Sequence, residues 1–313
     1  MSAMTIRQKL EVIQKMLGET QTQIAARLGV SFATVNSWWL EKSTPRAKMT
    51  TIIDDLYLTI TGKKTISTYI LDEKIQTLKQ KAKQYPNILS FILKNRDVYD
   101  ELILKLTYHS NSIEGSTLSE ADTQAILFDN VALPNKTLTE QIEAKNHQTA
   151  IHYLFDHIIT KKKISEELIL KLHSILMNGI LPDAGFYRRH AVRITGLNLA
   201  TSNYLKIPDL IPALIKKVIQ KNTDPIGHAA LVHAKFEHIH PFADGNGRIG
   251  RLLMNAMLLS NNFAPAIIRS DKKRLYYTYL YKAQRDGEIS QIEDFVCDAI
   301  FDGFLILGRK ELK

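Results

Sequence analysis

Residues 238–255 read HIHPFADGNGRIGRLLMN, and this stretch decides how the rest of the chain is interpreted. An apolar helical run from Asp224 to about His238 precedes it. A second run, from Arg248 to Ser260, carries leucine and methionine at helical spacing. The stretch therefore predicts a turn between two helices. It brings a histidine, a carboxylate, a glycine-rich segment and two arginines together, which is typical of an active site.

The glycine-rich segment indicates a phosphate site. The backbone N–H groups of Gly245, Asn246 and Gly247 open directly into a helix, whose N-terminus attracts anions. Arg248 and Arg251 lie three residues apart on one face of that helix, so both guanidinium groups can reach one polyanion. The pattern therefore predicts a ligand rich in phosphate.

Asp244 and His240 add chemistry to this phosphate site. A carboxylate beside a bound phosphate needs a cation between them, and Mg²⁺ prefers one or two carboxylates together with phosphate oxygens. We therefore expect Asp244 to be a Mg²⁺ ligand. His240 is placed to act as general base toward a hydroxyl that attacks the phosphate. A lone histidine or a lone Gly-Asn-Gly is more often an ordinary surface or turn feature, and it is their conjunction that points to catalysis.

The segment resembles the motif of the Fic family, HPFx(D/E)GNGRxxR, with Ala243 at the free position. The resemblance extends from about Tyr108 to the C-terminus. It implies an all-α, mainly helical fold with a small β-hairpin flap, and transfer of AMP from ATP to a protein hydroxyl in the presence of Mg²⁺. Gly247 fits this activity, because the branch that acts as a kinase has lysine there. The implied nucleotide contacts are Gly245, Asn246, Gly247, Arg248, Ile249, Gly250 and Arg251.

Residues 108–115 read YHSNSIEG and form the second informative segment. Read alone, Glu114 before Gly115 is the end of a helix with a glycine stop, although a carboxylate there opposes the helix dipole. Ser110-x-x-x-Glu114-Gly115 also resembles the inhibitory motif (S/T)xxxE(G/N) of Fic proteins that carry their inhibitor N-terminal to the core. The resemblance implies that Glu114 pairs with Arg251 and holds ATP in an unproductive pose. We therefore expect autoinhibition.

The alternating pattern from residue 185 to residue 204 predicts a small β-hairpin. The resemblance makes it the flap, whose backbone pairs with a target segment and presents a Ser, Thr or Tyr hydroxyl to His240. Relatives often carry a proline pair where this chain has Thr201 and Ser202, and often Asn where it has Gln284. The implied nucleobase contacts are Gly196, Leu197, Asn198, Leu199, Tyr276 and Gln284.

Residues 6–60 read as a bundle of short helices, within which Thr22 to Trp38 resembles a Cro/repressor-type helix-turn-helix. Gly29 lies in the turn, and Ser31 can cap the recognition helix. That helix carries no Lys or Arg, so phosphate contacts would come from its flanks and weaken with salt. The flanking cations are Arg27, Lys42, Arg46 and Lys48, and the residues facing base edges are Ser31, Phe32, Thr34 and Ser37. A role in protein contacts or dimerisation is the alternative.

The composition is that of a globular protein of 313 residues, 45% hydrophobic and with a formal charge of +9. The first hundred residues hold 15 Lys and Arg against 9 Asp and Glu, so most of the positive charge is N-terminal. This suits nucleic-acid contact, although a solvated charged face explains it equally well. The single cysteine, Cys297, excludes an internal disulfide. With neither a signal peptide nor a membrane-length apolar run in the sequence, we expect a cytoplasmic protein with no membrane partner.

We divide the sequence into a helix-turn-helix domain at 1–60, a connector helix and linker at 61–95, and a Fic domain at 96–313 with the inhibitory motif at 110–115. Two other functions remain open. One is a DNA-binding transcriptional regulator whose Fic core senses nucleotide, and the other is a net deAMPylase that uses Glu114. Relatives of this class and the helix-turn-helix both suggest a homodimer.

Overall fold

The computed structural model describes residues 4–61, 66, 68–129, 131–192 and 201–309. The chain groups into two compact units, one of residues 1–65 with 277–279 and one of residues 66–276 with 280–313. Every regular element in the described residues is helical, which confirms the all-α fold class. The expected β-hairpin is not seen: the described residues at its two ends form no strand, and its centre, residues 193–200, lies outside the described residues.

The first unit has four helices in its described part: α1 (Ile6–Leu17), α2 (Gln21–Leu28), α3 (Phe32–Trp39) and α4 (Ala47–Thr61). α2 ends at Gly29, which adopts the left-handed conformation at φ 68°. The Ser31 side chain then caps α3 by accepting the N–H of Thr34. A short turn therefore joins α2 and α3, while α1 packs against α3 and α4 around a buried apolar core that includes Leu10 and Ile13.

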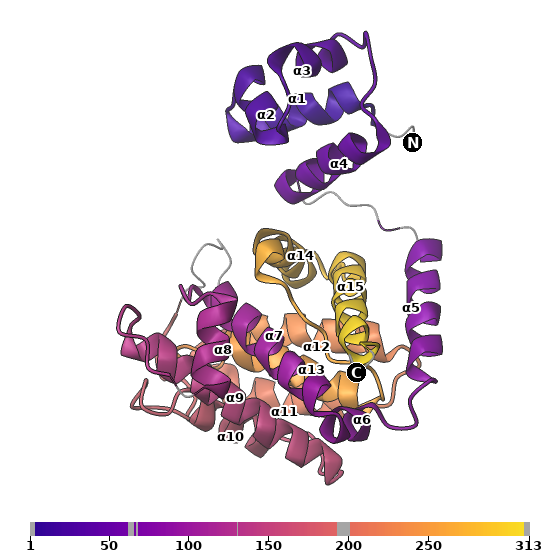
Figure 1. Cartoon of the computed structure of the whole chain (residues 1–313). Helices are drawn as coiled ribbons and strands as arrows, with labels where there is room; N and C mark the ends of the chain where they lie inside the picture. The colour runs from indigo at the N-terminus through magenta and orange to yellow at the C-terminus, as the bar shows by residue number, and fades with distance from the viewer. Residues whose placement is uncertain (1–3, 62–65, 67, 130, 193–200, 310–313) are drawn as a thin grey trace. The chain divides into compact units, whose positions relative to one another are not determined.

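The second unit contains the remaining helices, apart from residues 277–279 of α14 (Figure 1). Their bounds are α5 (Thr68–Ala82), α6 (Ile88–Lys94), α7 (Arg96–Glu114), α8 (Glu120–Phe128), α9 (Leu138–Ile159), α10 (Glu166–Leu176), η1 (Tyr204–Lys206), α11 (Ile207–Val218), α12 (Pro225–Ile239), α13 (Asn246–Ser260), η2 (Ser270–Lys272), α14 (Lys273–Asp286) and α15 (Ser290–Leu307). Within the described ranges, we find no helix with the length and apolar character needed to span a membrane.

α12 and α13 pack against each other at the centre of the second unit, where Figure 1 draws both in orange. α12 also contacts α11 and α15, and α13 contacts α7 and α9. α13 is buried on nearly all sides, from Asn246 to Leu259, although it carries two arginines and two asparagines. The turn that joins these two helices is therefore held by core packing at both ends.

The chain that follows α13 passes between α13 and α15. The Asn255 side chain accepts the Ala266 N–H at 2.8 Å and donates to the Ala266 carbonyl at 3.3 Å. Ile267 donates its N–H to the Ala299 carbonyl of α15 at 3.0 Å. Gly303 of α15 lies directly against the Pro265 carbonyl, where a Cβ atom would clash with backbone. Close packing at Gly303 therefore helps to hold the chain at residues 265–267 between α13 and α15.

We predict that Gly303→Ala destabilises the protein by about 1–3 kcal/mol, because the added methyl must displace the backbone at Pro265. Gly308→Ala is the matched control, since a Cβ there is only in ordinary contact with the Phe304 carbonyl and Gly308 has a right-handed φ of −83°. The control should stay within about 0.5 kcal/mol of the unmodified chain. Urea unfolding measures both, and equal stabilities for the two variants would contradict the packing argument.

Candidate active site

The motif segment folds into the turn between α12 and α13. His240 ends α12 in the left-handed conformation, with φ 52° and ψ 62°. Gly245 is also left-handed, at φ 80°, and α13 begins at the next residue, Asn246. This conformation is uncommon for a residue other than glycine, so the surroundings of His240 must hold its backbone in place.

The Asn246 side chain closes the turn. Its Oδ1 accepts the Phe242 N–H at 2.9 Å, and its Nδ2 donates to the Phe242 carbonyl at 2.9 Å. The residue is 2% exposed, so these bonds form in a dry environment where they are strong. Asn246 therefore sets the shape of the turn with its side chain and offers a ligand only its backbone N–H.

The His240 imidazole is oriented as a base. Nδ1 lies 3.2 Å from the Glu237 carbonyl, which can only accept a hydrogen bond, so Nδ1 carries the proton and Nε2 keeps its lone pair. Burial lowers the pKa of His240 below its ordinary value of 6.5, although the Glu237 carbonyl opposes this shift. The side chain is therefore neutral at pH 7, as a general base must be.

The start of α13 forms an anion site. Its first N–H groups, at Asn246, Gly247 and Arg248, have no acceptor within the helix, and the helix dipole places positive charge there. Asp244, with a side chain 60% exposed, accepts the Gly245 N–H at 2.6 Å. No group of three or more His, Cys, Asp or Glu residues that could hold a metal ion occurs among the described residues. One exposed carboxylate fits a Mg²⁺ ion that takes its other ligands from phosphate and water.

Arg248 is enclosed by carboxylates. Its Nη1 lies 2.6 Å from Glu143 Oε1 of α9, and its Nη2 lies 3.5 Å from Asp244 Oδ2. Arg248 is only 1% exposed. The sequence predicts Arg248 as a phosphate ligand, yet here it links the motif turn to α9 through Glu143, a residue that the motif did not indicate.

Arg251 reaches across to α7. Its Nη2 donates to Glu114 Oε1 at 2.6 Å and to the Ser110 carbonyl at 3.0 Å, and its Nε donates to Ser110 Oγ at 2.9 Å. Arg251 is 5% exposed, so this charged pair is largely withdrawn from solvent. Ser110 thus contacts the guanidinium through both its backbone and its side chain.

The Glu114 carboxylate lies against the start of α13. A Cβ atom at Gly247 would clash with Glu114 Oε1 and would also lie close to Arg251 Nη1. Glycine at position 247 therefore lets the carboxylate approach the exposed N–H groups at this helix end. Glu114 occupies a place where both the helix dipole and Arg251 favour negative charge.

A second carboxyl group, Glu237, lies in the interface between α12 and α13. Glu237 is 5% exposed, and a Cβ atom at Gly250 would clash with its Oε1. Burial, together with the nearby Glu114 charge, raises the pKa of Glu237 to about 8, although Arg251 opposes the shift. Glu237 is therefore protonated at neutral pH and does not compete as an anion for Arg251.

The predicted nucleobase contacts are split between the core and the undescribed segment. Tyr276 is 1% exposed, and its hydroxyl lies 2.5 Å from His233 Nε2, so it is a core residue here. Gln284 is partly buried and donates to the Ala234 carbonyl at 3.3 Å. The other predicted contacts, Gly196, Leu197, Asn198 and Leu199, lie outside the described residues.

The predicted base-reading residues of the first unit lie at the start and along one side of α3. Phe32 is 49% exposed. Ser31 Oγ lies 2.8 Å from Thr34 Oγ1, and Ser37 Oγ lies 2.7 Å from Ser43 Oγ. The hydroxyl groups therefore already have partners within the unit, and their contact with DNA stays a prediction.

A family model described as the Fic/DOC family matches residues 163–258. The match includes the whole turn from His240 to Arg251. The chain carries a Fic domain. At 33% identity over 193 residues, it is similar to the protein adenylyltransferase Fic of Drosophila erecta, and the Drosophila willistoni protein of the same name is 32% identical. Each alignment covers 61% of this chain but 39% of the relative, so the chain spans well under half of these proteins.

Solved structures of Fic proteins share the fold. Fic-1 from C. elegans, residues 134–508, superposes with a TM-score of 0.67 at 21% identity, covering 98% of this chain and 88% of that chain. A Fic domain containing signaling protein from Bacteroides thetaiotaomicron gives a TM-score of 0.65 at 23% identity, covering 75% and 96% respectively. At these identities the likeness establishes the fold of the Fic domain.

Two residues that support the Fic motif were not indicated by the sequence pattern. Arg188 is 3% exposed and donates to three carbonyls: His240 at 2.6 Å, Ser202 at 2.6 Å and His190 at 2.7 Å. His173 stacks on Phe242 at 3.7 Å between ring centroids and hydrogen-bonds the Asp244 carbonyl at 3.1 Å. In the sequence, these two positions show only a single arginine and a single histidine. Neither residue type by itself indicates a role in the motif turn.

We predict that Arg188→Ala destabilises the Fic domain by more than about 2 kcal/mol, because three carbonyls at and beside the motif turn lose hydrogen bonds from a buried guanidinium. Its neighbour Arg189 is exposed, so Arg189→Ala is the matched control and should change stability by less than about 0.5 kcal/mol. Thermal unfolding compares the two variants. A loss in Arg188→Ala no larger than that of the control would show that these hydrogen bonds do not hold the turn.

Proposed function

We propose that this chain is a protein adenylyltransferase, which transfers AMP from ATP to a Ser, Thr or Tyr hydroxyl of a target protein or of itself. The observation that carries the proposal is the single turn that joins a neutral base, His240, to the anion site at the start of α13. A base and an anion site on adjacent residues suit attack by a hydroxyl on a phosphate. The relatives named protein adenylyltransferase Fic support the same activity.

In this proposal the phosphates of ATP bind at the N–H groups of Gly245, Asn246 and Gly247, and Arg251 binds the terminal phosphate. Arg248 contributes to the same phosphate only if it leaves Glu143, with which it is paired at 2.6 Å. Asp244 would hold Mg²⁺, which neutralises phosphate charge when bound. Ile249 and Gly250 complete the nucleotide-binding turn of the helix.

His240 Nε2 then accepts the proton of the target hydroxyl, whose oxygen attacks the α-phosphorus of ATP. The bond from the α-phosphorus to its bridging oxygen breaks, pyrophosphate leaves, and AMP becomes esterified to the target. The left-handed backbone of His240 and the Arg188 bond to its carbonyl hold the imidazole at a fixed angle during this transfer. The proton taken up by His240 leaves to solvent before the next turnover.

The proposal includes autoinhibition by Glu114. The carboxylate is 2.6 Å from Arg251 Nη2, and it lies over Gly247, where the phosphates would bind. A terminal phosphate can reach Arg251 only by replacing this carboxylate. ATP bound with Glu114 in place would have its α-phosphorus out of line with the hydroxyl.

We expect His240→Ala to lower AMP transfer by about 10²–10⁴-fold, the usual contribution of a general base. Transfer of label from α-³²P-ATP to protein measures this loss. His157→Ala is the control, because His157 is a partly exposed histidine on α9 that hydrogen-bonds only to the Lys163 carbonyl in the described contacts. The comparison is made in the Glu114→Ala background, and comparable labelling with and without His240→Ala there would exclude the assigned base.

We expect Glu114→Ala to increase AMP transfer, because Arg251 is then released to bind the terminal phosphate. Glu120→Ala is the control, since Glu120 is paired with Lys105 at 2.6 Å on neighbouring helices outside the motif. The same labelling assay, with the chain itself and a lysate as acceptors, reads both variants. If neither Glu114→Ala nor the unmodified chain transfers label to any acceptor, the adenylyltransferase proposal fails.

The pH dependence of the released enzyme follows from His240. Burial lowers the pKa of this imidazole below 6.5, so Nε2 becomes protonated only below that pH. We expect kcat/KM of Glu114→Ala to be flat near pH 7 and to fall only below pH 6.5, with Mg²⁺ in excess so that ATP stays ionised. A half-maximal point above pH 6.5 would contradict the assignment of a buried neutral base.

The acceptor in this proposal is a protein segment that approaches through residues 185–204. Val192 and Thr201, at the two ends of the undescribed part, are joined by a hydrogen bond of 3.0 Å, and Ser202 donates its N–H to the His238 carbonyl at 3.1 Å. These contacts support a segment anchored next to His240. A homodimer and removal of AMP by Glu114 also remain proposals. Loss of AMP from a pre-modified target, dependent on Glu114, would identify the reverse reaction.

For the first unit we propose a helix-turn-helix domain at 1–60, followed by a connector at 61–95 and the Fic domain at 96–313. The short turn between α2 and α3 and the N-terminal excess of positive charge support DNA binding. Arg27, one of the cations expected to contact phosphate, is paired with Glu19 instead. The alternative is a nucleotide-sensing transcriptional regulator. It would be favoured if the chain binds an operator tightly and independently of His240 and transfers AMP to no protein.

A further inference from the structure

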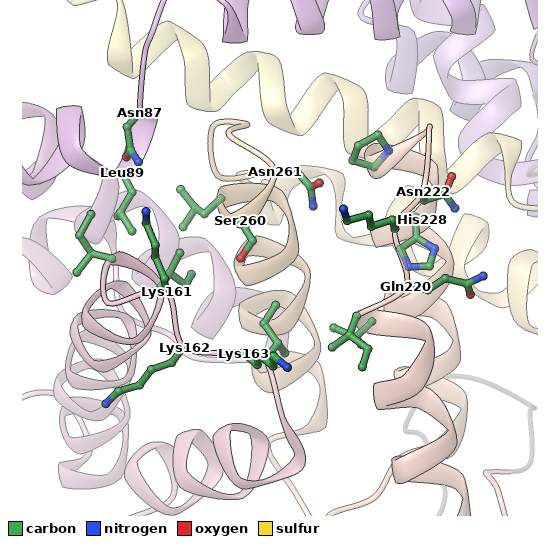
Figure 2. Close-up of a pocket in the computed structure, with 18 residues that line it drawn as sticks. Asn87, Leu89, Lys161, Lys162, Lys163, Gln220, Asn222, His228, Ser260 and Asn261 are labelled. Atoms are coloured by element: carbon green, nitrogen blue, oxygen red, sulfur yellow. The ribbon is translucent and has the colours of Figure 1, made fainter.

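A cavity of about 630 Å³ opens in the second unit at the ends of α12 and α13 that lie away from the motif turn (Figure 2). It is lined by Pro225 at the start of α12 and by Ser260 at the end of α13. His240 follows the other end of α12, and a helix of 15 residues is about 22 Å long. The cavity is therefore separate from the proposed active site, although the same two helices reach both.

The cavity is positively charged. Four lysines line it, Lys161, Lys162, Lys163 and Lys221, and no Asp or Glu does. None of the four makes an ion pair with a carboxylate in the part of the chain that the structure describes. In Figure 2 the Lys161 side chain extends toward Leu89, whereas Lys162 points away from the cavity. We call the cavity lined by these residues the lysine pocket.

Part of the wall of the lysine pocket is apolar, although polar residues such as Asn87, Gln220 and Asn261 also line it. Leu89, Ile164, Val218 and Leu259 are buried beneath it. Ile219 also lines it and is 56% exposed, which is unusual for an isoleucine at the edge of a hollow. A volume between about 300 and 1,000 Å³ with an apolar wall and a few convergent polar groups is typical of sites for small molecules.

Helix dipoles account for only part of this arrangement. α9, α11 and α13 all end at the pocket, and lysines near C-termini are favourable because the carbonyl ends are negative. That effect requires cations on the surface of each helix end. The dipole effect does not explain why the lysines surround a hollow with apolar residues in its wall. It also does not explain why Lys161 has a left-handed backbone, with φ 55°, at a position where glycine is usually found.

We propose that the lysine pocket binds a small organic anion, with its apolar body against Ile219 and Leu89 and its carboxylate or phosphate at Lys161, Lys163 and Lys221. Charge complementarity supports the anion, because four lysines and no carboxylate line the pocket. The apolar wall supports a ligand with a hydrophobic body over a simple inorganic ion. This inference does not depend on the proposed adenylyltransferase activity.

The test is calorimetric titration of the full chain at low ionic strength with three probes: 2-naphthoate, neutral 2-naphthylmethanol, and inorganic phosphate. We expect saturable binding of one 2-naphthoate per chain, with about tenfold weaker binding of both other probes. Excess AMP should leave this binding unchanged, because the nucleotide site is at the other end of α12. Displacement by AMP would place the probe in the motif turn and would overturn the proposal.

Charge-reversal variants locate the site. Lys161→Glu with Lys221→Glu should weaken 2-naphthoate binding by at least about tenfold. The control is Lys94→Glu with Lys171→Glu, which makes the same change in net charge at exposed lysines outside the pocket and should leave the affinity unchanged. Ile219→Ser tests the apolar wall and should also weaken binding.

Three results would overturn the proposal: no saturable binding, equal affinities of the pocket variant and the control variant, or equal affinities for 2-naphthoate and the neutral alcohol. Binding of an acidic peptide in place of 2-naphthoate would overturn it as well, because the ligand would then be a protein segment. Both double variants should melt near the melting temperature of the unmodified chain. A loss of affinity then reports a change at the pocket and not unfolding of the variant.

Discussion

The ion pair between Glu114 and Arg251 is the contact on which the account of this Fic domain depends. It joins the last residue of α7 to the helix that carries the motif, at 2.6 Å, with Ser110 accepting two further hydrogen bonds from the same guanidinium. Here a helix N-terminus and a buried cation both favour negative charge. In the function proposed above, an internal carboxylate and the terminal phosphate of ATP compete for one set of donors.

The neighbourhood of this pair is arranged so that few other groups enter the competition. Arg248 is paired with Glu143, and Glu237 is neutral at pH 7 because burial raises its pKa to about 8. Two glycines make the approach possible: a side chain at Gly247 would clash with Glu114, and one at Gly250 would clash with Glu237. The cost of burying this ion pair is partly offset by the two hydrogen bonds that Arg251 donates to Ser110.

The sequence was most informative where the chemistry is local. The apolar spacing on either side of residues 240–245 located α12 and α13, and the turn between them followed from the glycine-rich segment at 245–247. Glu143, Arg188 and His173 could not be found in this way, because they reach Arg248, His240 and Asp244 from 105, 52 and 71 residues away. Tyr276 was expected at the nucleobase from its position alone; here it is buried beside His233, and its contact with a nucleobase stays a prediction.

The most direct test of the competition is the affinity for ATP and for AMP, measured by calorimetry in the unmodified chain, Glu114→Ala, Arg251→Ala and the double variant. AMP lacks the terminal phosphate, so it does not contest Arg251. The account predicts that removing Glu114 strengthens ATP binding by about tenfold or more, leaves AMP binding nearly unchanged, and has no effect on ATP once Arg251 is gone. Equal changes for ATP and AMP, or an ATP gain that persists without Arg251, would contradict it.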